Sequence, residues 1–388
     1  MSRPQHEAVH DPIAFIDLHA QYRRLKANID AALAHVLEDG RFVLGPAVGE
    51  LEAALAARAG VAHAVTCASG TDALQIALMA EGIGPGDAVF VPGFTFPATA
   101  GVVALVGATP VFVDVAEESC MMDPADLAAR IERVTADGRL TPRAVIAADL
   151  FGQAADYDVL APLAVERGLL LIDDAAQSFG GMSGDRPVGA LAPVTTTSFY
   201  PAKPLGGYGD GGALFTDNAA RAAHWRSVRQ HGQGEGKYDI VRVGLNSRLD
   251  TLQAAILLVK LAAFDAEIDA RERVVTLYDS VLEGAVGLPG RLPGRLPGRR
   301  STWAQYTIRL DRRDAVQAAL AGQGIPTAIH YPVPMHLQPA YRAHGDGPGS
   351  LPVSERLSRQ VLSLPMHPDL DEATAVRIAR AVRDAAAG

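Results

Sequence analysis

Between residues 63 and 216 the chain alternates short, almost wholly apolar runs with stretches of helical periodicity, and this alternation limits the possible folds most. Strands that are apolar along their whole length are buried on both faces, which is typical of a mostly parallel sheet covered by helices. We therefore predict an α/β fold with a large domain built on such a sheet. The expected strands are His63–Cys67, Val89–Val91, Val111–Val113, Ala144–Ala147, Leu169–Ile172, Val194–Tyr200 and Ala213–Thr216.

Helical patterns flank this region. Residues 20–60 carry apolar side chains every three or four positions, and residues 250–275 form one long helical stretch. We expect the long helix to lead into a smaller C-terminal α+β domain. The predicted domains are residues 1–262, an N-terminal arm with the large domain, and residues 263–388, the small domain.

A tandem Leu-Pro-Gly-Arg repeat occupies residues 288–300. It could be a basic arm for an anionic partner, but a surface-loop insertion is the favoured interpretation. Proline and glycine at this density predict that the repeat contains no packed element.

Composition excludes several classes of protein. Cys67 and Cys120 are the only cysteines among 388 residues and form no C-x-x-C motif, so we expect neither a disulfide framework nor a metal site. The net charge of −9 argues against nucleic-acid binding, which needs a basic face. The uncharged stretch 89–113 contains prolines and glycines that break it, and the polar N-terminus is unlike a signal peptide, which predicts a cytoplasmic protein without a membrane partner.

Polar residues follow several predicted strands, at the edge where such sheets bind ligands. Ser69, Gly70 and Thr71 stand between a strand and a helix, where free backbone amides bind anions such as phosphate, although serine and threonine are also ordinary helix caps. Asp173 and Asp174 end another strand. Asp173 could be a helix cap, whereas Asp174 suits a protonated ring nitrogen.

Two further strand ends carry an aromatic residue and a lysine. Phe96 follows the strand 89–91 and could cover a flat ring, although a core position is the default for a phenylalanine. Lys203 is one of only four lysines and follows the strand 194–200. Residues 207–212 also match G-x-G-x-x-G. A strand follows them, however, whereas the dinucleotide fingerprint must open a helix, so we reject that interpretation.

These motifs together resemble a known family. The stretches SGTDAL, PGFTF, DDAAQS, SFYPAKPLGGYGDGG and GLNSRLDTLQAA look like the DegT/StrS family of sugar-nucleotide aminotransferases, which have fold type I and use pyridoxal 5′-phosphate (PLP). The motifs occur in the family's order and spacing, from about Phe15 to the C-terminal helix.

The resemblance implies a role for each matched residue. Lys203 would hold PLP as a Schiff base and move the proton between cofactor and substrate. The implied cofactor-binding residues are Gly70, Thr71 and Ser198 at the phosphate, Phe96 on the ring, Asp174 at the ring nitrogen, Gln177 at the phenolic oxygen, and Asn246 reaching the phosphate from a second subunit. A homodimer with shared sites follows from the last of these.

The chemistry of lysine agrees with this assignment. An ordinary lysine, with a pKa of ~10.4, is protonated at neutral pH and is a poor nucleophile. Burial and a nearby cation lower that pKa enough for Schiff-base exchange. Lys26, Lys237 and Lys260 do not follow strand ends, which favours Lys203.

Further stretches around residues 229–261 and 324–367 resemble the branch of the family that acts at sugar carbon 3. This implies transfer of the amino group of L-glutamate, through pyridoxamine phosphate, to the C3 ketone of a nucleotide-linked sugar such as UDP-2-acetamido-2-deoxy-3-oxo-glucuronate. Arg248, His330 and Tyr331 would line the sugar site, because arginine suits a uronate carboxylate. Alternatively, Arg248 pairs with Asp250 or backbone, and His330 is a domain-interface residue.

The sequence leaves three other functions to consider. One is a dTDP-3-keto-6-deoxyhexose aminotransferase of an antibiotic pathway. A deoxysugar dehydratase is less favoured, because dehydratases of this kind replace the lysine with histidine. A non-catalytic PLP-binding regulator would need a DNA-binding region, and no basic domain precedes the fold.

Overall fold

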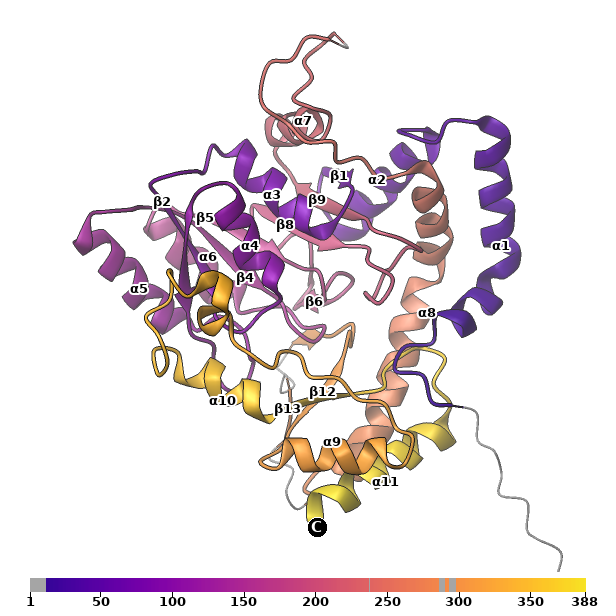
Figure 1. Cartoon of the computed structure of the whole chain (residues 1–388). Coiled ribbons are helices and arrows are strands. Elements are labelled where there is room, and N and C mark those ends of the chain that lie inside the picture. Colours follow the sequence, from indigo (N-terminus) through magenta and orange to yellow (C-terminus); the bar gives the residue numbers. More distant parts are fainter. Residues whose placement is uncertain (1–11, 237, 286–289, 293–297) are drawn as a thin grey trace, which may run out of the picture.

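The computed structural model describes residues 12–236, 238–285, 290–292 and 298–388. Its centre is a sheet of seven described strands that forms the middle layer of the molecule (Figure 1). All of them run parallel except β9, which is antiparallel to both neighbours. Across the sheet the order is β1 (His63–Cys67), β9 (Gly212–Thr216), β8 (Val194–Ser198), β5 (Leu170–Asp174), β4 (Thr141–Ala148), β2 (Asp87–Pro92) and β3 (Thr109–Val113). The predicted α/β class and all seven predicted strands are confirmed.

Helices cover both faces of this sheet because adjacent strand residues point to opposite sides. Ile146 and Ile172 pack with α3 (Gly70–Ala80), α4 (Pro97–Leu105) and α7 (Ala219–Val228). Their neighbours Val145 and Leu171 pack on the other side with α5 (Pro124–Asp137) and α6 (Tyr157–Glu166). Burial on both faces explains why most of these strands are largely apolar; β8 is an exception, because three of its five residues are buried threonines.

The helical segments flank the β1 edge of the sheet. They are α1 (Leu18–Asp39), α2 (Pro46–Ala59) and the long helix α8 (Thr251–Leu282). The first half of α8 packs against α2 and the sheet through residues such as Leu257 and Phe264. Its second half supplies Val275 and Tyr278 to a separate C-terminal core. The boundary predicted between residues 262 and 263 therefore falls inside one continuous helix, and the division into two domains stays a prediction.

The C-terminal core forms around a small antiparallel sheet in the order β10 (Gly290–Leu292), β12 (Tyr306–Arg309) and β13 (Val361–Leu364). It is covered by α9 (Arg313–Ala321) and α11 (Glu372–Ala387), and α10 (Pro352–Gln360) joins it to the large sheet (Figure 1). Between β12 and α10 the chain returns to the large sheet, where Met335 and Leu351 join the core that contains α3 and α4.

The prediction that the Leu-Pro-Gly-Arg repeat contains no packed element is wrong at two places. Residues 290–292 form the edge strand β10, and β11 (Arg299–Arg300) pairs with β6 (Met182–Ser183), which also pairs with β7 (Arg186–Pro187). An edge strand pairs on one side only, and the repeat's prolines lie outside both strands. Most of the remaining repeat lies outside the described residues.

Within the described part of the chain, no helix is long and apolar enough to cross a lipid bilayer.

Candidate active site

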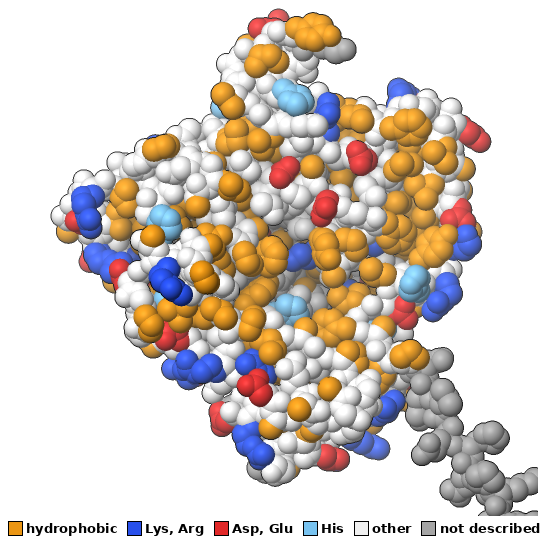
Figure 2. Space-filling model, in the orientation of Figure 1, with side chains coloured by type: hydrophobic (Ala, Val, Ile, Leu, Met, Phe, Trp, Pro, Cys, Tyr) orange, Lys and Arg blue, Asp and Glu red, His pale blue; other side chains and the backbone are white. Residues whose placement is uncertain are grey.

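A cavity of ≈ 660 Å³ opens at the carboxyl ends of β1, β2, β5 and β8. Parallel neighbours end at the same edge of a sheet, so residues far apart in sequence meet there. The predicted residues that line it are Gly70, Thr71, Phe96, Asp174, Gln177, Ser198, Lys203, His330 and Tyr331. Hydrophobic side chains gather over the middle of the face shown in Figure 2, and Phe96, 52 % exposed, is one of the apolar residues that line the cavity.

The start of α3 forms a cradle beside the end of β8. Ser69 Oγ accepts a hydrogen bond of 3.0 Å from the Asp72 amide and so caps the helix. The Gly70 and Thr71 amides belong to the first turn, where the helix offers no acceptor, and they are available to an anion. A Cβ on Gly70 would lie 2.6 Å from Ser198 Cβ. Only glycine therefore brings this helix start so close to the Ser198 hydroxyl.

Asp174 is a buried carboxylate at the end of β5, with 8 % of its surface exposed. Its Oδ2 accepts a hydrogen bond of 3.0 Å from Thr99 Oγ1 of α4, and Thr99 Oγ1 lies 3.1 Å from Thr95 Oγ1. Burial raises the pKa of Asp174, whereas the Thr99 bond and the charge of Lys203 lower it. A buried carboxylate of this kind is stabilised by a cationic partner in the cavity.

Lys203 lies in the turn after β8, with its amide donating to the Tyr200 carbonyl at 2.8 Å. Burial lowers the pKa of Lys203, and the charge of Asp174 opposes this shift. The lysine is thus biased toward the neutral, nucleophilic amine, as the sequence argument requires.

The far wall of the cavity comes from the C-terminal part of the chain. Gln177 Nε2 donates to the Tyr331 hydroxyl at 2.9 Å, and Gln177 Oε1 accepts from the Phe151 amide at 2.8 Å. His330 Nδ1 lies 2.9 Å from Ser363 Oγ of β13. Burial and the charge of Lys203 lower the pKa of His330 to about 4, so the imidazole is neutral at pH 7.

Asn246 and Arg248 do not line this cavity. They lie in a neighbouring cavity of ≈ 430 Å³, where Arg248 Nη2 donates to Asn246 Oδ1 at 2.6 Å. The alternative in which Arg248 pairs with Asp250 is therefore not observed. Asp210 lines both cavities, so the two are adjacent.

Sequence reasoning missed several residues of the site. Thr99, which donates a hydrogen bond to Asp174, lies on helix α4, whose sequence contains no recognisable motif. Asp149 and Gln305 also line the cavity, and Gln305 Oε1 has no hydrogen-bond partner among the described residues. Asp149 comes two residues after the end of the predicted strand 144–147. A search for polar residues at strand ends, which found Asp174, could therefore have found Asp149 as well.

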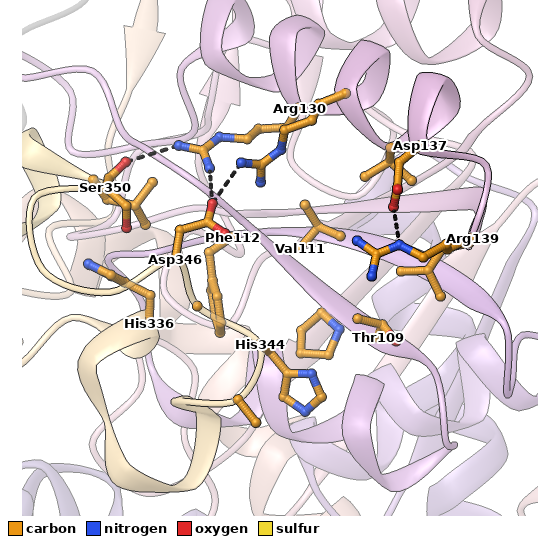
Figure 3. Close-up of a pocket in the computed structure, with 17 residues that line it drawn as sticks. Thr109, Val111, Phe112, Arg130, Asp137, Arg139, His336, His344, Asp346 and Ser350 are labelled. Atoms are coloured by element: carbon orange, nitrogen blue, oxygen red, sulfur yellow. Dashed lines mark hydrogen bonds and ion pairs between the residues drawn. The ribbon is translucent and has the colours of Figure 1, made fainter.

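A third cavity, of ≈ 570 Å³, lies between α5, β3 and the segment before α10 (Figure 3). Arg130 Nη1 and Arg133 Nη1 both contact Asp346 Oδ2, at 3.1 and 2.7 Å, and Arg139 Nε contacts Asp137 Oδ2 at 2.6 Å. Each of these arginines thus already has a carboxylate partner. Two of these ion pairs, those of Asp346, join the C-terminal segment to α5.

The cavity at the sheet edge therefore defines a class of protein. A buried lysine, a buried carboxylate and an anion cradle at a helix start, on a mostly parallel sheet, are the elements of a PLP-dependent enzyme of fold type I. Residues 23–383 match the DegT/DnrJ/EryC1/StrS aminotransferase family. The chain belongs to this family and is a PLP-dependent aminotransferase.

Comparison with individual proteins agrees with the match to this family. The chain is 47% identical to a UDP-2-acetamido-2-deoxy-3-oxo-D-glucuronate aminotransferase of Pseudomonas aeruginosa, over 93% of this chain and 97% of the relative. It is 42% identical to a dTDP-3-amino-3,4,6-trideoxy-alpha-D-glucose transaminase of Streptomyces venezuelae, covering 96% of each chain. The crystal structure of a family aminotransferase from Brucella abortus matches with a TM-score of 0.93 and 51% identity, over 96% of this chain and 99% of that one.

The residues present fit PLP. The Gly70 cradle could hold its phosphate, because a Cβ there would fill the space next to Ser198. Asp174 could pair with the ring nitrogen, and Lys203 lies in the same cavity to bond with the aldehyde. Phe96 could cover the ring.

We expect Gly70→Ala to weaken PLP binding by about 10- to 100-fold, because overpacking of this kind costs about 1–3 kcal/mol. The measurement is a titration of cofactor-free protein with PLP, followed by absorbance. Gly49→Ala is the matched control, since a Cβ on Gly49 meets nothing within 4 Å. Equal PLP affinity of Gly70→Ala and wild type would place the phosphate elsewhere.

Proposed function

We propose that this aminotransferase transfers the amino group of L-glutamate to the C3 ketone of UDP-2-acetamido-2-deoxy-3-oxo-D-glucuronate. The observation that carries the amino transfer is the placement of Lys203 and Asp174 in one cavity with the cradle at Gly70. The sugar is supported by the relative from Pseudomonas aeruginosa, which has 47% identity over nearly its whole length.

PLP, when bound, supplies an electron sink that makes the proton on the amine-bearing carbon acidic. Lys203 would hold the cofactor and, as a neutral amine, would be the base that takes this proton and gives it back. Asp174 would pair with the ring nitrogen and favour its cationic form. Gln177 orients the Tyr331 hydroxyl through their hydrogen bond.

The neutral His330 is suited to the sugar rather than to a carboxylate. With its Nδ1 at Ser363, its Nε2 is left to accept from or donate to a sugar hydroxyl. Gln305 offers a second polar group to the same ligand. A uronate carboxylate needs a cation, and Arg248 is the candidate, although it lies outside the cavity of its own chain.

This placement leads us to propose a homodimer in which Asn246 and Arg248 act in the partner subunit's cavity. Asn246 is exposed, and Arg248 is held by it at the surface. Large apolar side chains are exposed in the nearby segments, which favours a covered face. They are Phe42, Val43, Tyr200, Tyr238, Ile240, Val241 and Val243, with exposed fractions from 47 to 87 %.

Complementation between two inactive variants tests the shared site. Lys203→Ala and Arg248→Ala are each expected to be impaired, and co-expression of the two should restore activity, because a mixed dimer has one cavity with both native residues. The matched control is Lys203→Ala with His330→Ala, which line the same cavity and should not complement. Activity that stays absent in the first pair would show that Arg248 does not act across subunits.

Two measurements test the reaction itself. Addition of L-glutamate to the PLP-loaded protein should convert its absorbance to that of pyridoxamine phosphate, with release of 2-oxoglutarate. A panel of 3-keto nucleotide sugars with and without a C6 carboxylate then tests the acceptor. We expect the uronate to be preferred and Arg248→Ala to remove the preference. Preference for a dTDP-3-keto-6-deoxyhexose would contradict the proposed sugar.

A further inference from the structure

Three buried side chains lie at the active cavity or next to it, and they take no part in the proposed reaction; Asp149 lines the cavity, and the other two contact each other behind it. Asp149 follows β4, Tyr157 begins α6 and Asp173 lies in β5, and each is at most 1 % exposed. The Tyr157 hydroxyl lies 3.0 Å from Asp149 Oδ1 and 2.8 Å from Asp173 Oδ1. We call these three residues the Tyr157 cluster. Asp173 is therefore not a helix cap, which was one interpretation of the sequence.

The number of hydrogens available for hydrogen bonding in this cluster decides whether both carboxyl groups can be ionised. A phenol has one hydrogen to donate, and an ionised carboxylate has none. Two oxygen–oxygen contacts of hydrogen-bond length therefore need a second hydrogen, which must come from a protonated carboxyl group. If Asp149 and Asp173 were both ionised, one contact would bring lone pairs together beside two buried charges, at a high cost.

In the described part of the chain, neither of these carboxyl groups has a cationic partner. Among the described residues, no lysine, arginine or histidine lies within 4 Å of Asp149 or Asp173. Arg299 approaches from β11, but its Nη1 donates to the Ala154 and Ala155 carbonyls and its Nη2 contacts Asp156. Tyr157 and Asp174 act on the pKa of both carboxyl groups, and Asp149 acts on that of Asp173.

The surrounding donors identify which carboxyl group keeps the proton. Asp149 accepts from Ser178 Oγ at 2.5 Å and from the Ala155 amide at 2.8 Å, in addition to Tyr157. Among the residues that the structure describes, Asp173 has only one other donor, Thr195 Oγ1 at 3.2 Å. Hydrogen bonds stabilise the charged form of a carboxyl group, so the charge belongs on Asp149.

We propose that Asp173 is protonated in the folded enzyme and donates to Tyr157, which in turn donates to the ionised Asp149. Burial raises the pKa of both carboxyl groups, that of Asp149 to about 7. Because Asp149 accepts more hydrogen bonds than Asp173, Asp149 is the carboxyl group that loses its proton, and Asp173 keeps its own.

A neutral Asp173 has a consequence for the neighbouring catalytic carboxylate. Asp174 is adjacent on β5, and its carbonyl accepts from the Asp149 amide at 3.1 Å. The charge of Asp174 raises the pKa of Asp173, and by the same repulsion a charge on Asp173 would raise the pKa of Asp174. An uncharged Asp173 thus helps Asp174 to remain ionised, and Asp173 and Tyr157 act as positioning residues. This inference concerns the folded chain itself and does not depend on the identity of the sugar.

The pH dependence of unfolding tests the proposal. The folded state holds a proton that Asp173 releases on unfolding, so above pH ~7 this residue makes the unfolding constant rise about tenfold for each pH unit. Asp173→Asn lacks this proton. We therefore expect the ratio of its unfolding constant to that of wild type to fall about tenfold per pH unit between about pH 7.5 and 9.

Asp158→Asn is the matched control, since it neutralises an exposed carboxylate that pairs with Arg186, and its ratio to wild type should stay constant. A constant ratio for Asp173→Asn would overturn the proposal.

Infrared spectroscopy of the cofactor-free wild type provides a second measurement that does not need the variants to be stable. At pH 8, where ordinary carboxyl groups are ionised, we expect one protonated-carboxyl C=O band. Tyr157→Phe should shift this band, because it removes the acceptor of the Asp173 hydrogen. Absence of the band in the wild type would overturn the proposal.

Discussion

Lys203→Ala is expected to abolish amino transfer from L-glutamate, with steady turnover at least ~10²–10⁴-fold below wild type. The variant loses both the covalent bond to PLP and the base that moves the proton, and no other described lysine lines the cavity. The measurements are steady-state turnover and the absorbance of the PLP-loaded protein. Borohydride reduction should fix PLP to the wild type and not to the variant.

Lys26→Ala is the control for this experiment, because Lys26 is an exposed lysine paired with Asp30 on α1. It should retain both turnover and the reducible bond. Steady turnover by Lys203→Ala would contradict the proposed mechanism, whichever sugar the enzyme uses.

Asp174→Asn is expected to lower turnover by ~10- to 10³-fold while PLP still binds. A carboxylate beside a cation raises the pKa of that cation by ~1–3 units, and each unit corresponds to a factor of ten. The neutral amide removes this support for the protonated ring nitrogen but keeps the size of the side chain. The measurements are turnover and the PLP affinity of the same preparation.

The control is Asp158→Asn, which neutralises an exposed carboxylate paired with Arg186. Its turnover should equal that of wild type. If Asp174→Asn turned over as fast as wild type, the ring nitrogen would not depend on Asp174. A variant that lost PLP altogether would instead show that Asp174 mainly holds the cofactor.

The parts of the site that sequence reasoning found share one property: each is local to a strand end. Gly70, Asp174 and Lys203 lie at the end of a predicted strand or within a few residues after it, and a parallel sheet brings such positions to one edge whatever the details of packing. His330 and Tyr331 were found by family resemblance, because nothing local connects them to the strands. The hydrogen bond between Gln177 and Tyr331 joins residues 154 positions apart.

The sequence interpretations that the structure corrects failed for a common physical reason. The Leu-Pro-Gly-Arg repeat was predicted to contain no packed element, yet β10 and β11 obtain their stability from partner strands and not from their own composition. Asp173 was open to interpretation as a cap because its partners, Tyr157 and Thr195, lie on other elements. Contacts between distant segments carry no signal in a short window of sequence.

The sequence by itself determined the α/β class, the seven strands and the lysine at the site, because hydrophobic periodicity and strand ends are local properties of the chain. Only the tertiary structure decided which groups surround those residues. In the folded chain Thr99 donates a hydrogen bond to Asp174, and Asp149 and Asp173 both contact the Tyr157 hydroxyl. Arg248 lies outside the active cavity of its own subunit. The charge state of a buried carboxyl group depends on these neighbours and on burial, which exist only once the chain has folded.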